Sequence, residues 1–279
     1  MTNTNSVLTT INYGFPPVDG TRARQTINAD PVTGQRDRNW TLKSHKVQVE
    51  NIRGREDTVS LDTAGFQFYT SPSKYKGSFL DDEEIRTEYY PESEELIKQL
   101  TGATKVVFFD HTIRRNQPGL VDGSPDKRQP VLQAHVDHTT ASAIARVHRH
   151  LPSDEVPELL KRRFQVINLW RPIGVPALEF PLTLCDYRSV DPKKDVFPVA
   201  LVYLDREGET LAVKHNPNHK WKYVRGMTPD DFVLIKCFDS VQNGSVAIFT
   251  PHTAFSDPTT PEGAPRRQSI EIRALVFYD

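Results

Sequence analysis

The chain has 279 residues, with 35 Lys and Arg against 36 Asp and Glu, and hydrophobic residues make up 37% of it. This near balance, with a pI of about 6.8, argues against a nucleic-acid partner, and no cationic amphipathic segment indicates a membrane surface. No apolar run approaches the roughly 20 residues that span a bilayer, no secretory signal is visible, and two cysteines are too few to staple the chain, so we expect a cytoplasmic protein.

The first hundred residues predict an arm, then strands, then helices. Residues 1–40 are rich in Thr, Asn, Pro and Gly and predict an irregular arm lying over the domain. Alternating and β-branched residues at 45–52 and 57–69 are typical of strands. Residues 81–102 predict one or two helices, because acidic residues crowd the turn after Pro91 and Gly102 follows the end.

The rest of the chain is dominated by predicted strands. An apolar run at 105–110 is typical of a strand buried on both faces. A strand at 129–138 leads into a helix at 139–151 with Thr139 or Thr140 as N-cap. Further strands are predicted at 164–170, 231–238, 244–252 and 267–278, with a Pro-rich insertion at about 171–230. This spacing predicts a β-rich jelly-roll or barrel, a single domain over residues 41–279, with helices packed outside.

The segment His135-Val136-Asp137 carries the strongest chemical signal. Side chains alternate faces along a strand, so His135 and Asp137 project to the same side. One imidazole and one carboxylate supply two of the three ligands of a 2-His-1-carboxylate site for Fe(II), which leaves positions open for a co-substrate and dioxygen. The simpler alternative is a polar strand end whose histidine is hydrogen-bonded in the core.

His252 and the strand that follows it complete the predicted site. His252 stands at the end of an apolar predicted strand, where it can point into a barrel opening. Arg267 and Ser269 share one face of the next strand, and an arginine fork beside a hydroxyl suits the far carboxylate of an oxoacid co-substrate. Arg273 lies on that same face and is the alternative clamp. A solvent-exposed polar face is the competing interpretation of this strand.

Several of these motifs resemble a known family. LQAHVDHTTASA, NLWRPI, LCDYRSV, IKCFDS, TPHTAFSDP and RRQSIEIRALVFYD are similar to the AsaB-like hydroxylase/desaturase family, which includes gibberellin desaturase-like and cephem methoxylase-related proteins, from about Glu88 to the C-terminus. The resemblance implies a double-stranded β-helix, a cofactor set of Fe(II), 2-oxoglutarate and O2, metal ligands at His135, Asp137 and His252, and a co-substrate clamp at Arg267 and Ser269.

Other polar residues are weaker candidates. Asn168 is a possible contact of the co-substrate, and Arg171, His111 and Arg114 are possible contacts of the substrate. Each has an ordinary structural alternative, a capping amide or a salt-bridged loop. No catalytic residue is predicted beyond the metal site.

The function expected from these residues is an Fe(II)/2-oxoglutarate-dependent oxygenase. It would hydroxylate, desaturate or cyclise a small natural-product intermediate by removing hydrogen from a C–H bond. Two alternatives are a zinc-dependent hydrolase on the same His/Asp/His set and a non-catalytic jelly-roll binding protein.

Overall fold

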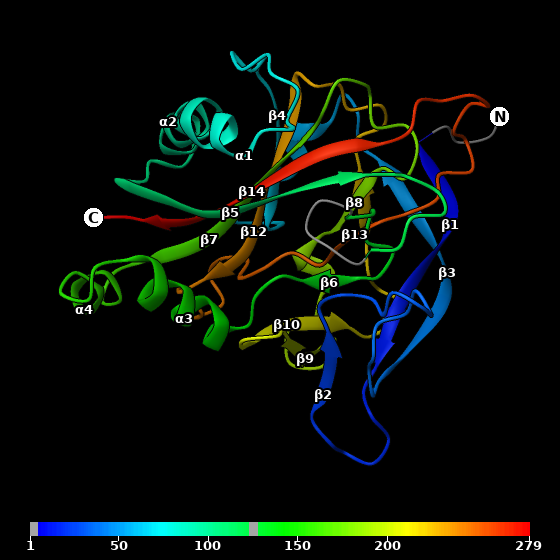
Figure 1. Ribbon diagram of the computed structural model, residues 1–279, viewed down its shortest axis with the longest axis horizontal. Helices are drawn as coiled ribbons and strands as arrows, with labels where there is room; N and C mark the ends of the chain where they lie inside the picture. The colour runs from blue at the N-terminus through cyan, green and yellow to red at the C-terminus, as the bar shows by residue number, and fades with distance from the viewer. Residues whose placement is uncertain (1–4, 123–127) are drawn as a thin grey trace.

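A computed structural model describes residues 5–122 and 128–279, and it contains two β-sheets that curl around a shared interior (Figure 1). The first sheet has five strands in the order β4-β12-β7-β14-β5. These strands span Phe66–Thr70 (β4), Asp231–Asp239 (β12), Phe164–Pro172 (β7), Gln268–Phe277 (β14) and Lys105–Arg115 (β5).

The second sheet has nine strands in the order β1-β3-β11-β8-β13-β6-β10-β9-β2. These strands span Ser6–Phe15 (β1), Thr41–Asn51 (β3), Trp221–Tyr223 (β11), Leu182–Cys185 (β8), His252–Ala254 (β13), His135–Val136 (β6), Glu207–Val213 (β10), Val196–Val202 (β9) and Ala23–Thr26 (β2). From β5 to β8, and again from β12 to β14, successive strands alternate between the two sheets. This alternation is the winding of a jelly-roll, the fold predicted from the strand spacing.

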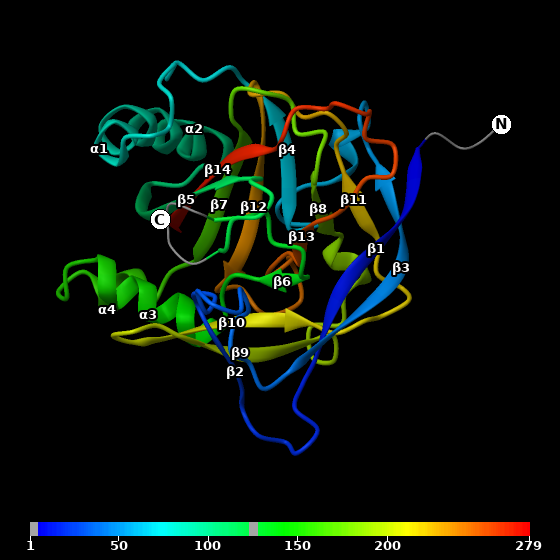
Figure 2. The same cartoon turned by 45° about the vertical axis from the view of Figure 1, so that its right-hand side comes forward.

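The helices are α1 (Asp82–Glu84), a π-helical turn (Ile85–Tyr89), α2 (Tyr90–Thr101), α3 (Thr140–His150) and α4 (Val156–Leu159). The π-helical turn and α2 cover the outer face of the five-stranded sheet, as predicted, whereas α3 packs against inner-face residues of that sheet (Figure 2). Gly102 ends α2 at a φ of 73°, a conformation that costs glycine little. Thr139 caps α3 by accepting a hydrogen bond from the backbone N–H of Ser142. None of the helices in the described ranges is long and apolar enough to cross a membrane.

The two faces of the five-stranded sheet have different partners. Ile270 and Ile272 of β14 point outward and join Tyr89 and Ile97 in an apolar cluster under α2. On the inner face, Trp170 and Val233 pack with Leu184 of the second sheet and with Val147 of α3. Residues 267, 269, 271 and 273 therefore line the interior, because they alternate with the isoleucines along β14.

The N-terminal segment departs from its prediction as an irregular arm. Over the described residues 5–40 it supplies β1 and β2, and the predicted residues 1–4 lie outside the described ranges. β1 pairs along its whole length with β3, and Ile11 and Tyr13 are buried against Trp221. The strand escaped prediction because Thr and Asn interrupt its apolar residues, and the half-buried Thr9 lies on the same face as the buried Ile11 and Tyr13.

The predicted strand at 244–252 is also corrected. No strand is assigned within residues 244–251, and His252 begins the short β13 instead of ending a strand. The Pro-rich residues 171–230 contribute β8 to β11, of which β8 pairs with β13 and β10 pairs with β6. These residues therefore help to hold both strands that carry the candidate ligands.

A buried ion network lies near the end of β12 (Lys236 and Asp239). Lys236 is fully buried and donates to the carboxylates of Asp62 and Asp239, at 2.8 Å each. Arg163 donates to the same two carboxylates at 2.7 Å. The two acids differ in setting, because the Asp239 side chain is fully buried while 52% of the Asp62 side chain is exposed.

Asp239→Asn is expected to lower the free energy of unfolding by about 3 kcal/mol, because breaking a buried pair leaves an uncompensated charge. Asp62→Asn is expected to lower it by less than about 1 kcal/mol, because solvent screens the exposed carboxylate. Urea unfolding of both variants measures the difference. Equal losses in the two variants would contradict this account of the network.

Candidate metal centre

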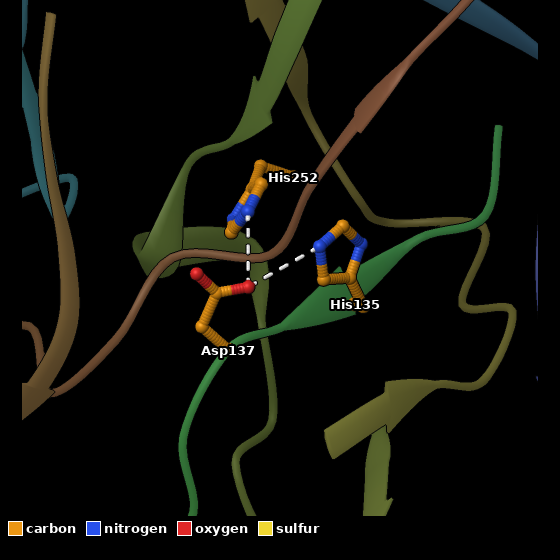
Figure 3. A group of neighbouring side chains, drawn as sticks. All are labelled: His135, Asp137 and His252. Atoms are coloured by element: carbon orange, nitrogen blue, oxygen red, sulfur yellow. Dashed lines mark ion pairs between the residues drawn. The ribbon is translucent and has the colours of Figure 1, made fainter. Parts of the chain in front are cut away.

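Three side chains from separate parts of the chain converge between the sheets (Figure 3). His135 and His252 are directly opposed in the antiparallel pairing of β6 with β13, which places their ring centroids 4.4 Å apart. Asp137 follows β6 and points its Oδ1 between the rings, 3.3 Å from Nε2 of His135 and 3.8 Å from Nε2 of His252. The three ligand atoms lie within 4.8 Å of one another, a spacing at which one metal ion can be held.

Backbone carbonyls fix the orientation of both imidazoles. Nδ1 of His135 lies 2.8 Å from the carbonyl oxygen of Gln133, and Nδ1 of His252 lies 3.0 Å from that of Thr250. A carbonyl only accepts hydrogen bonds, so each Nδ1 carries the proton and each Nε2 keeps its lone pair. Burial also lowers the pKa of His252, with a further contribution from His135. Both rings are thus held in the tautomer that binds a metal through Nε2.

The second carboxylate oxygen of Asp137 accepts two hydrogen bonds from residues of the five-stranded sheet. Oδ2 accepts a hydrogen bond from Nδ2 of Asn168 at 2.7 Å and one from Nε of Arg273 at 3.1 Å. Burial is the largest influence and disfavours ionisation of Asp137, but Arg273, His135 and His252 together outweigh it and hold the pKa well below its usual range. The carboxylate is therefore ionised, with Oδ1 left to face the histidines.

Every nitrogen of the Arg273 guanidinium donates a hydrogen bond to a protein group. Besides Asp137, it donates to Asp110 at 3.1 Å, to the hydroxyl of Thr112 at 2.9 Å and to Glu271 at 2.6 Å. Burial opposes its charge, but Glu271, Asp110 and Asp137 together raise its pKa well above the usual value. This arginine has no free donor pair for a bidentate carboxylate, which disfavours the alternative clamp predicted at Arg273.

Arg267 directly precedes β14 and faces the same way as Arg273, but its guanidinium has few protein partners. Its side chain is buried, its guanidinium lies 5.0 Å from the Trp170 ring centroid, and it donates to the carbonyl oxygen of Phe180. The contact with Ser269 is long, at 3.4 Å, and Nε has no hydrogen-bond partner within the described ranges. Burial, with Arg114 second, lowers its pKa to about 9. A buried cation without an anion is costly, and this one is suited to an incoming carboxylate.

Phe180 contributes to this arrangement through its backbone. It has a φ of 45°, a left-handed conformation that is unusual for a bulky residue. Its carbonyl oxygen accepts the hydrogen bond from Arg267. Local strain at this position is therefore tied to the placement of the guanidinium.

A cavity of about 500 Å³ opens beside the three converging residues. His135 and Asp137 line it from β6, and the helix α3 that begins just after them lines one wall through Ala141, Ala145 and Arg146. Leu201 and Tyr203, near the end of β9 and just after it, also line the cavity. The volume suits one small organic molecule.

The remaining predicted residues are placed as follows. Arg114 lines the cavity and donates to the carbonyl oxygen of Gln129. His111 also belongs to the lining, but its ring contacts Tyr90 and Asp82 in the helical layer. Arg171 lies next to Trp170 on the outer face of the sheet and donates to backbone carbonyls of Ser71 and Pro229, so it does not belong to the site. Asn168 contacts Asp137, which gives it an orienting role.

The sequence analysis did not predict two groups of residues that contribute to the site. The carbonyls of Gln133 and Thr250 carry no side-chain signal. The wall formed by α3 did carry one, because Ala141, Ala145 and Arg149 are spaced four residues apart and share a helix face. His138 and Ser142, which bond to each other at 3.1 Å, extend the same wall.

Comparisons with known proteins agree with this geometry. A family model described as an oxidoreductase/YMDC permease-like domain matches residues 11–277. The chain is 32% identical to hydroxylase/desaturase efuI of Hormonema carpetanum, over 98% of this chain and 96% of the relative. It is 32% identical to the Fe(II)/2-oxoglutarate-dependent dioxygenase nvfI of Aspergillus novofumigatus, over 94% and 93%. A solved structure of the iron and alpha-ketoglutarate-dependent endoperoxidase NvfI superimposes with a TM-score of 0.84, 28% identity and 99% coverage of both chains.

Asn168→Ala is expected to weaken binding of a divalent first-row metal by about tenfold or more, because Asp137 loses one of the two donors that orient it. Titration with Co(II), followed by its visible absorption, measures the affinity. Asn243→Ala, in an exposed loop, is the matched control and should bind Co(II) normally. Unchanged affinity in Asn168→Ala would contradict the orienting role.

Proposed function

Since the chain belongs to the hydroxylase/desaturase family of Fe(II)/2-oxoglutarate-dependent oxygenases, we propose that His135, Asp137 and His252 hold its iron and that Arg267 with Ser269 holds its co-substrate. The enzyme is a non-haem iron dioxygenase that uses Fe(II), 2-oxoglutarate and O2. The observation that carries the site assignment is the convergence of two Nε2 lone pairs and one ionised oxygen within 4.8 Å.

The donor set fits iron. Two neutral imidazoles and one carboxylate form the facial arrangement that non-haem Fe(II) oxygenases use, with the remaining positions open. When bound, Fe(II) together with 2-oxoglutarate and O2 supplies the oxidising power that removes hydrogen from an unactivated C–H bond. The protein residues orient the ligands and shape the cavity. No residue beyond the metal site is proposed as catalytic.

The charges of the interior support a dicarboxylate co-substrate. Three arginines face it, at positions 114, 267 and 273, and three carboxylates face it, at positions 110, 137 and 271. These six charges balance one another, so the two negative charges of 2-oxoglutarate would offset the two positive charges that Fe(II) adds. Arg267 is the favoured clamp because its Nε has no partner and Ser269 lies beside it, whereas Arg273 is occupied.

The substrate in this proposal is a small natural-product intermediate, which the enzyme hydroxylates, desaturates or cyclises. The size of the cavity beside His135 and Asp137 supports a small molecule. The hydrolase and binding-protein alternatives have no support, because the similar proteins are named as hydroxylases, desaturases and dioxygenases. A cytoplasmic location remains part of the proposal, and the two buried free cysteines are consistent with it.

His135→Ala and His252→Ala are each expected to abolish Fe(II)-dependent formation of succinate from 2-oxoglutarate, because either change removes one of three ligands. Circular dichroism should show that both variants keep the native strand content. His148→Ala, on the exposed side of α3, is the control and should turn over normally. Full turnover in both ligand variants would overturn the metal assignment.

Arg267→Gln and Arg273→Gln are expected to impair different steps, the binding of 2-oxoglutarate and the binding of Fe(II). Arg267→Gln should raise the KM for 2-oxoglutarate by about tenfold or more, because a charge-assisted bond to its carboxylate is lost, while Fe(II) affinity stays. Arg273→Gln should weaken Fe(II) binding, because Asp137 loses its positive partner.

The stability of Arg267→Gln provides a separate check. Burial lowers the pKa of this arginine to about 9, so its charge opposes folding at neutral pH and removing it should not lower the free energy of unfolding. In the kinetic experiment, a KM for 2-oxoglutarate that rises only in Arg273→Gln would contradict the proposal and make Arg273 the clamp.

A further inference from the structure

The cavity beside the candidate metal centre carries more positive than negative charge. Eight arginines line it against four acidic residues, Asp110, Asp137, Glu207 and Glu209. Most of these arginines are neutralised. Arg22 pairs with Glu207 and Glu209, Arg36 and Arg128 pair with Asp122, and Arg206 pairs with Asp205. Arg273 pairs with Asp110 and Asp137. Arg114 has no carboxylate within 4.0 Å among the described residues, but it donates to the carbonyl oxygen of Gln129.

Two arginines of α3 differ from all of these, because neither kind of partner is found for them in the described ranges. Arg146 and Arg149 lie on the helix face that lines the cavity, and neither has a carboxylate within 4.0 Å among the described residues. Asp110 is the acid whose charge acts most on Arg146, but its carboxylate is bonded to Arg273 at 3.1 Å. The cavity therefore retains positive charge on this wall.

Arg146 is held in place without an anion. Its guanidinium lies 4.8 Å from the centroid of the Phe109 ring, and its Nη1 lies 3.5 Å from Nε2 of His150. The His150 ring stacks on the same Phe109 ring, with centroids 5.3 Å apart. A half-buried guanidinium fixed by an aromatic face keeps its donors available for a planar anion such as a carboxylate.

The surroundings of Arg146 are suited to the rest of such a molecule. Ala141 and Ala145 lie on the same helix face and leave room along the wall, and Leu201 and Tyr203 also line the cavity. These small and apolar side chains thus line the same cavity as His135 and Asp137. A molecule with an apolar body and one acidic end matches this distribution.

We propose that the substrate carries a carboxylate, and that Arg146 binds it, with Arg149 adding positive charge at the rim. The acidic end is anchored on α3 while the apolar body extends toward the metal centre. Arg146 is in this account a specificity-determining residue, because an ester or amide of the same molecule offers no negative charge to its guanidinium. This inference rests on the proposed function, since it concerns the substrate of that site.

The test uses 2-naphthoate and its uncharged analogue 2-naphthamide as probes. Binding to the full chain is measured by calorimetry without oxygen, in saturating 2-oxoglutarate so that the co-substrate site is filled, with and without Fe(II). The wild-type chain should bind the acid about tenfold tighter than the amide, as one charge-assisted hydrogen bond allows. Arg146→Gln should lose this preference, and Arg149→Gln should reduce it.

Arg162→Gln is the charge-matched control, because Arg162 pairs with Asp279 and does not line the cavity; it should keep the full preference. Equal affinity for acid and amide in the wild-type chain would overturn the proposal, and so would a preference that survives Arg146→Gln. A preference lost in Arg267→Gln instead would place the acid in the co-substrate site, which also contradicts it. Fe(II) binding by the same samples reports separately on the metal centre.

Discussion

The carboxylate of Asp137 is the point on which the site depends, because its two oxygens have different partners. Oδ2 is held by Asn168 and Arg273 from the five-stranded sheet, and Oδ1 faces His135 and His252 on the nine-stranded sheet. The proposed metal centre is thus built from residues of both sheets. Its geometry requires that β6, β13 and β14 keep their relative positions, which the jelly-roll winding provides.

The inner face of β14 shows how neighbouring positions acquire different roles. Arg267 and Arg273 are the same residue type on the same face, yet the Arg273 guanidinium contacts three carboxylates and the Arg267 guanidinium contacts none in the described ranges. A saturated arginine orients its neighbours, and an unsaturated buried one is suited to a ligand. The same comparison separates Arg146 from the paired arginines of the cavity.

The sequence predicted the parts of this structure that depend on local pattern. The alternation in His135-Val136-Asp137 and along β14 predicted a shared inward face, and Gly102 and Thr139 marked helix ends. Parts that depend on distant partners were not predictable in the same way. β1 is a strand because β3 pairs with it, His252 is positioned by its pairing with β6 and β8, and the preference between Arg267 and Arg273 depends on which acids lie nearby.

Anomalous diffraction at the iron edge, from crystals grown without oxygen in Fe(II) and 2-oxoglutarate, tests the central claim most directly. The account predicts one anomalous peak bounded by Nε2 of His135, Nε2 of His252 and Oδ1 of Asp137, and the distal carboxylate of 2-oxoglutarate on Arg267. An iron peak away from these three atoms, or a co-substrate carboxylate bound to Arg273, would contradict it.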